Sequence, residues 1–277
     1  MCNYTKSYRK LLFILFRVVQ SSINDFSSQE EWKSFAHALS LKIYRHLVTI
    51  ERLSSPQLDP ITGDRHVDFA SINVLCRAML ENFLVFSHIY GTEDQSLGEL
   101  RFRLWKCYGL MKRQKIKTST TTYDCQIAAE RQEIADLWNQ IKKSPLYEQK
   151  YSKAQRGQLE AENWMGVNKA PILAKEAGLH QNYFANLYNS GSGYGHSGYI
   201  SAIQVSQART LEKQQELANV SLGVGLFIMT HFLLMFVEMS TDAKNVLEAD
   251  PDSNALFSRW HIQEHEWEKL YSKQYRK

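Results

Sequence analysis

A polar stripe runs along an otherwise apolar stretch of the chain, residues 69–90. Asn73, Arg77, Glu81 and His88 are spaced by four, four and seven residues, which places them on one face of a helix. An unpaired buried charge is very costly, so these groups must be paired or used. Two interpretations follow. Arg77 and Glu81 form a structural ion pair, or Glu81 holds the Arg77 guanidinium ready for an anion or a charged transition state.

A second candidate is the segment 188–198, which holds four glycines and His196. Glycine lets the backbone approach a partner closely, and a histidine in a turn can act as a general acid or base near neutral pH. We expect residues 190–198 to form a turn between two helices. The alternative is a connecting loop in which His196 only hydrogen-bonds a carbonyl group.

Together, residues 66–90 and 171–200 resemble a family of uncharacterised bacterial helical proteins. That family has an R-x-x-x-E helix and a later Y-R-x-x-S-x-x-x-H segment, and it is similar to the HEPN (higher-eukaryote and prokaryote nucleotide-binding) fold. Here the matching residues are Arg77 and Glu81 in the first element, and Tyr188, Ser192 and His196 in the second.

The resemblance implies chemistry on RNA, because active HEPN proteins are metal-independent endoribonucleases, commonly dimeric, that act as toxins or antiphage effectors. His196 would deprotonate a 2′-hydroxyl and Arg77 would stabilise the phosphorane. Asn189 stands where the family has arginine and brings no charge. Either Arg77 supplies the cation or this protein is not a nuclease. The catalytic candidates are His196, Arg77, Glu81 and Asn189, and the supporting candidates are Tyr188, Ser192, Tyr194, His88 and Asn73.

Seven basic side chains and no acidic one lie between residues 101 and 117. They are Arg101, Arg103, Lys106, Lys112, Arg113, Lys115 and Lys117. One interpretation is a solvated helix face. The other is a track for a phosphate backbone, with nearby aromatic rings available for stacking.

The segment 220–239 is long and apolar enough to span a bilayer. It lacks a basic cluster at one end and an aromatic belt, so we favour the central core helix of a bundle.

The rest of the chain predicts an all-α fold. Proline and glycine are scarce (5 and 13 of 277 residues), apolar residues recur every three to four positions, and no strand-type alternation appears. We expect a HEPN-like multi-helix bundle in one domain, with peripheral terminal helices. The expected parts are an amphipathic helix over 1–26, a helical core over 27–247 and a charged helix over 248–277.

The four cysteines form no C-x-x-C pair, which indicates a reduced, cytoplasmic protein. No motif calls for a cofactor or a metal. The function that the resemblance implies is RNA binding or cleavage by a homodimer. The alternatives are a non-catalytic helical module that binds a protein partner, and a protein associated with a membrane through residues 220–239.

Overall fold

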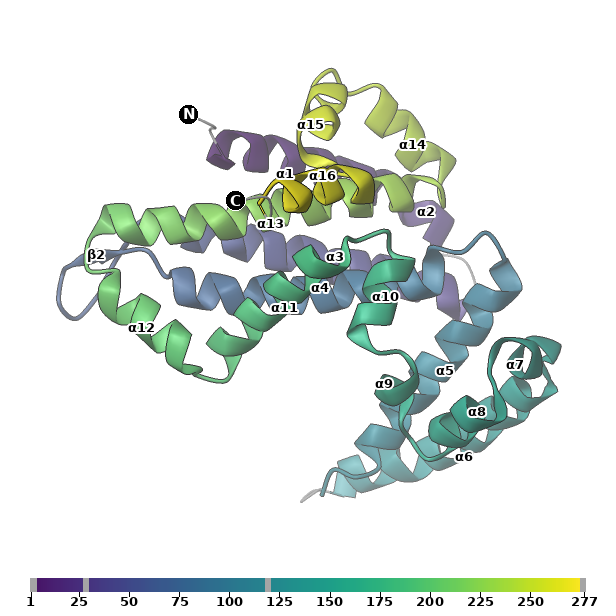
Figure 1. The fold of residues 1–277 in the computed structure, drawn as a ribbon. Helices are drawn as coiled ribbons and strands as arrows, with labels where there is room; N and C mark the ends of the chain where they lie inside the picture. Colours follow the sequence, from purple (N-terminus) through teal and green to yellow (C-terminus); the bar gives the residue numbers. More distant parts are fainter. Residues whose placement is uncertain (1–3, 27–29, 118–120, 275–277) are drawn as a thin grey trace. The chain divides into compact units, whose positions relative to one another are not determined.

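The computed structural model describes residues 4–26, 30–117 and 121–274, and it confirms the predicted all-α bundle (Figure 1). The helices are α1 (Tyr4–Ser21), α2 (Ile23–Phe26), α3 (Glu31–Leu53), α4 (Phe69–Tyr90), α5 (Gln95–Arg113), α6 (Thr121–Lys143), α7 (Pro145–Lys150), α8 (Lys153–Glu160), α9 (Trp164–Val167), α10 (Ala170–Glu176), α11 (Gln181–Gly195), α12 (Tyr199–Gln207), α13 (Leu211–Val237), α14 (Thr241–Glu248), α15 (Ser253–Trp260) and α16 (Glu264–Gln274).

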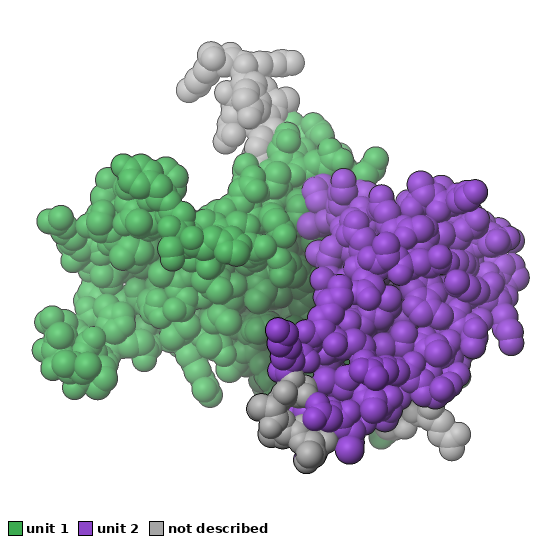
Figure 2. All heavy atoms as spheres, turned by 90° about the horizontal axis from the view of Figure 1, so that it is seen from below, with its two compact units in different colours: residues 1–86, 174–277 green, residues 87–173 purple. Residues whose placement is uncertain are grey.

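The chain forms two compact units (Figure 2). Unit 1 combines Met1–Phe86 with Ala174–Lys277, and unit 2 is Ser87–Leu173. The sequence pattern predicted one helical core domain over residues 27–247. The structure differs because residues 87–173 pack largely against one another, with α5 against α6 and α7.

In unit 1, α13 is the central helix, and it packs against α1, α3, α14 and α15 (Figure 1). Phe227 and Phe232 of α13 are buried, as are Tyr8 and Leu11 of α1. The N-terminal helix, expected at the periphery, is therefore part of this core. Its close approach depends on Gly225, where an added Cβ would lie 2.6 Å from the Tyr8 ring.

Two helices in the described ranges, α4 and α13, are long and apolar enough to cross a membrane. In α13, 78% of the most apolar stretch is buried within the protein. That burial explains the apolar composition of this helix without a bilayer. The helix begins at Leu211, nine residues before the apolar segment 220–239, and Ala208–Thr210 separate it from α12.

The connection between α3 and α4 contains a small hairpin. Strands β1 (Gln57–Leu58) and β2 (Arg65–His66) pair antiparallel. Asp59 accepts the backbone N–H groups of Ile61 and Thr62 at 2.8 and 2.9 Å. Gly63 adopts a φ of 75°, which a side chain would disfavour. Local turn chemistry therefore closes this hairpin.

Candidate functional site

The Arg77 side chain of α4 reaches α11 and gathers a polar cluster in unit 1. Its Nε donates to Glu81 Oε1 at 3.1 Å, its Nη1 donates to Ser192 Oγ, and its Nη2 donates to the Tyr188 hydroxyl at 3.2 Å. The guanidinium carbon also lies 4.6 Å from the centre of the Tyr188 ring, a cation–π distance. We call Arg77, Glu81, Tyr188 and Ser192 the Arg77 cluster.

A glycine allows α4 and α11 to meet this closely. An added Cβ at Gly191 would lie 2.7 Å from Arg77 Cβ and 3.4 Å from the Asn73 carbonyl oxygen. Tyr188 and Ser192 are one helical turn apart, so both face Arg77 from the same side of α11. The cluster therefore depends on the register of these two helices.

Water reaches the Arg77 cluster. The side chain of Arg77 is 21% exposed and that of Glu81 is 47% exposed. A guanidinium has five N–H donors, and three have partners within the described chain. The remaining two N–H groups could bind an anion from solvent, at a site where Glu81 balances the positive charge of Arg77.

His196 is the C-cap residue of α11, which remains helical through Gly195, and it lies with Ser197 in a short turn. The expected turn over 190–198 is thus corrected to a short helix end at 196–198. There the Gly198 N–H donates to the Gly193 carbonyl at 2.7 Å, and Ser197 takes a φ of 53°. This is the Schellman pattern, with serine where glycine is usual.

The His196 side chain is exposed at the end of α11. It makes no hydrogen bond to the Arg77 cluster within the described ranges, but it follows Ser192 by four residues. Four helical residues rise about 6 Å, so His196 lies about one helical turn beyond the Arg77 partner Ser192 along α11. Asn189 is also exposed, and it precedes His196 by seven residues, which places both on one stripe of α11.

The other supporting candidates have structural contacts. Asn73 donates to the Phe69 carbonyl of its own helix at 2.8 Å. The Tyr194 hydroxyl donates to Gln204 at 2.8 Å, and its ring meets Phe69 edge-on. His88 belongs to unit 2, where its ring is buried with an edge toward Trp164 at 6.1 Å. The structure therefore does not bring His88 into the Arg77 cluster.

The basic stretch 101–117 lies in unit 2, and four of its seven cations pair with carboxylates. These pairs are Arg103–Glu99 at 3.0 Å, Lys106–Glu133 at 2.6 Å, Arg113–Glu130 at 2.5 Å, and Lys115–Glu162. Arg101 donates to the His88 carbonyl at 2.8 Å, and the Lys112 ammonium lies 5.4 Å from the centre of the Tyr108 ring. Lys117 is exposed. RNA would have to compete with these carboxylates for the basic side chains. The local sequence did not reveal this competition, because three of the carboxylates lie beyond residue 129.

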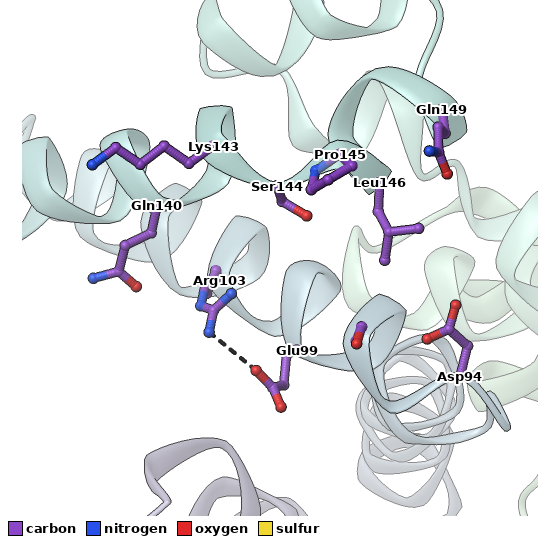
Figure 3. Close-up of a pocket in the computed structure, with 10 residues that line it drawn as sticks. Asp94, Glu99, Arg103, Gln140, Lys143, Ser144, Pro145, Leu146 and Gln149 are labelled. Atoms are coloured by element: carbon purple, nitrogen blue, oxygen red, sulfur yellow. Dashed lines mark hydrogen bonds and ion pairs between the residues drawn. The ribbon is translucent and has the colours of Figure 1, made fainter.

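Unit 2 also contains an open groove of about 680 Å³ that the sequence pattern did not indicate (Figure 3). Asp94, Glu99 and Arg103 line it from the α5 side, and Lys143 and Leu146 line it from the other. Arg103 is paired with Glu99 across one helical turn (Figure 3). Acidic and basic groups are therefore balanced here, and the groove shows no preference for a charged ligand.

Metal-ligating side chains are not gathered in the part of the chain that the structure describes. No group of three His, Cys, Asp or Glu residues there is placed to hold a metal ion. His261 and His265, which are four residues apart, are divided between the end of α15 and the start of α16.

The comparisons with known proteins give a family without an assigned activity. The model of a family of unknown function (DUF5677) matches residues 37–210, more than half of the chain. This range includes all of α4 and α11, and therefore the whole Arg77 cluster. No curated protein and no solved structure matches the chain.

Proposed function

We propose that this chain, which belongs to this family of unknown function (DUF5677), binds RNA at the Arg77 cluster and cleaves it with HEPN-like chemistry. The observation that carries the proposal is a partly exposed guanidinium, Arg77, bound to Ser192 and Tyr188 on α11, the helix that ends at the exposed His196. These are the two groups that a metal-independent ribonuclease needs.

The proposed reaction assigns one role to each group. His196 accepts the proton of a ribose 2′-hydroxyl, whose oxygen attacks the adjacent phosphorus. The two open N–H groups of Arg77 bind the phosphate oxygens as negative charge develops. The bond to the 5′-oxygen breaks, and that oxygen takes a proton from water. The products are a 2′,3′-cyclic phosphate and a free 5′-hydroxyl.

Glu81 and Tyr188 position the cation in this scheme. Glu81 fixes Nε, and the Tyr188 ring supports one face of the guanidinium. A guanidinium held in this way loses little side-chain entropy when it binds a phosphate. The resemblance further leads us to propose a homodimer, in which two such sites act together as in HEPN toxins and antiphage effectors.

A second function is favoured by a specific observation. Arg77 on α4 donates to both Ser192 and Tyr188 on α11, and Gly191 brings the two backbones together. In that case the Arg77 cluster is a clasp between α4 and α11, and the protein is a helical interaction module.

A cleavage assay with fluorescent single-stranded RNA in excess chelator separates these functions. His196→Ala should lower the rate at least about 100-fold without changing the melting temperature, because His196 is exposed. His265→Ala is the matched control, since His265 is an exposed histidine on α16, and it should keep the rate.

RNA binding is measured in the same preparations by fluorescence anisotropy. His196→Ala should still bind RNA, whereas Arg77→Ala should lose both binding and cleavage. If wild-type protein neither binds nor cleaves RNA, and Arg77→Ala only lowers the melting temperature, the ribonuclease proposal fails and the clasp remains.

A further inference from the structure

The segment 261–269, which we call the C-terminal cover, lies over aromatic side chains of α11 and α13 in unit 1. The Trp267 ring stacks on Tyr183 at 3.9 Å and 17°, and it meets Phe227 edge-on at 6.0 Å. Glu268 accepts from His180 Nε2 at 3.2 Å. The carboxylate is largely exposed, so this pair adds little stability. Trp267 is therefore the main anchor of α16 among its described side chains.

An imidazole pair marks the point where the cover leaves α15. The rings of His231 on α13 and His261 at the end of α15 lie 4.4 Å apart. His231 Nε2 also lies 3.4 Å from the Ile262 carbonyl. Residues 261–263 are not helical and join α15 to α16. The His261 N–H donates to the Phe257 carbonyl and the Gln263 N–H to Glu266, both at 2.9 Å, so the link is held by local hydrogen bonds while His231 and His261 meet above it.

The pair strongly disfavours protonation while the cover is closed. Burial and, to a smaller extent, the neighbouring His261 lower the pKa of His231 to about 4, against the opposing contact with the Ile262 carbonyl. Burial also lowers the pKa of His261, and Glu266 opposes that shift. Two cationic rings at this distance would repel each other, and no carboxylate acts directly on His231. A proton is therefore accepted most easily when the two rings separate.

The third histidine under the cover does not need a proton for its contact. His180 Nδ1 accepts the Tyr183 backbone N–H at 3.3 Å, which leaves the hydrogen on Nε2 to donate to Glu268. The neutral ring thus already makes both bonds. His231 and His261 remain as the groups whose protonation conflicts with the closed position.

We propose that the C-terminal cover is an acid-released strap: uptake of a proton by the His231–His261 pair detaches residues 261–269 from α11 and α13. Release uncovers the rings of Tyr183 and Phe227, an aromatic surface available to a partner only under acidic conditions. Tyr183 lies on the same helix as the Arg77 cluster. The strap itself does not rest on the proposed function.

Hydrogen exchange tests the strap on the full chain. Protection factors, corrected for intrinsic exchange rates, are measured for residues 264–269 and for α3 at pH 7.5 and 5.0. If opening returns His231 to its ordinary pKa of 6.5, the linkage favours the open state about thirty-fold more at pH 5.0. Protection of 264–269 should fall by about that factor, while α3 keeps its protection.

Two variants define the trigger. His231→Phe keeps an aromatic ring beside Phe227 but cannot take a proton, so most of the fall should disappear. His265→Gln removes an exposed histidine from α16 and should leave the fall unchanged. In the wild-type protein, a fall of less than threefold in the protection of residues 264–269, or an equal fall in the protection of α3, overturns the strap. An undiminished fall in a folded His231→Phe protein overturns it as well.

Discussion

Alanine substitutions at two glycines of α11 should change stability in opposite directions. At Gly191 the new Cβ would lie 2.7 Å from Arg77 Cβ, closer than two carbons approach without strain. Overpacking of this kind costs about 1–3 kcal/mol. Alanine in a helix recovers about 1 kcal/mol relative to glycine. The net result is a loss of up to about 2 kcal/mol.

Gly193 is the matched control, because it lies two residues further along the same helix with open space where its Cβ would be. Gly193→Ala should therefore gain about 1 kcal/mol from helix propensity alone. Urea denaturation followed by circular dichroism measures both variants. With a slope of about 1–3 kcal/mol per molar urea, the two midpoints should differ by about 1 M, with wild type between them.

The sign of each shift is decisive. If Gly191→Ala raises the midpoint as Gly193→Ala does, α4 and α11 do not approach each other as closely as described here. If Gly193→Ala lowers the midpoint, residue 193 is not in a helix, and the turn expected from the sequence would be correct after all.

Three further substitutions or modifications follow from the packing. Gly225→Ala should cost a net of up to about 2 kcal/mol in the same denaturation assay, because its Cβ would meet the fully buried Tyr8 ring and alanine recovers about 1 kcal/mol in the helix. Ser197→Gly should gain about 0.5–1 kcal/mol, since glycine adopts the φ of 53° without strain. Burial raises the pKa of Cys76 and Cys107 from 9.0 to about 12, so at pH 8 the thiolate fraction falls from about one tenth to about one ten-thousandth. Peptide mass spectrometry after brief iodoacetamide treatment should therefore find both thiols unmodified in native protein and modified in urea.

Helix boundaries set by local chemistry could be predicted from the sequence. Aspartate favours a helix N-cap, and the carboxylate of Asp68, just before α4, accepts the Ser71 N–H at 3.0 Å. Glycine favours a helix end, and Gly91 directly follows α4, which ends at Tyr90. In both cases the signal and the structure lie within four residues of each other. The start of α5 is harder to place, because Asp94 and Ser96 are both favourable N-cap residues and only Asp94 caps the helix.

The glycine-rich part of α11 could not be predicted, because its conformation depends on a distant segment. Four glycines in eight residues favour a turn when only local propensity is considered. In the structure Gly191 is buried against α4, and packing there is possible only for a residue without a side chain. Tertiary packing therefore overrides the local preference, and the helix continues to Gly195.

The partners of the charged residues were equally hidden from the sequence. Ser192 and Tyr188 lie 115 and 111 residues from Arg77, and spacing alone could only suggest the adjacent Glu81. The basic stretch shows the same limit, because Lys106 takes its carboxylate from Glu133 on another helix. The net charge of the surface around a basic stretch therefore depends on where the fold places the acidic residues.

Both functions considered for the Arg77 cluster need the Arg77 guanidinium, so a loss of cleavage in Arg77→Ala does not by itself separate them. Removing the guanidinium would loosen the contact between α4 and α11 as well as remove a catalytic cation. His196 is different, because it is exposed and makes no hydrogen bond to the cluster in the described ranges. A clasp has no use for its imidazole, whereas a ribonuclease fails without a base. The exposed residue is therefore the one whose substitution distinguishes catalysis from packing.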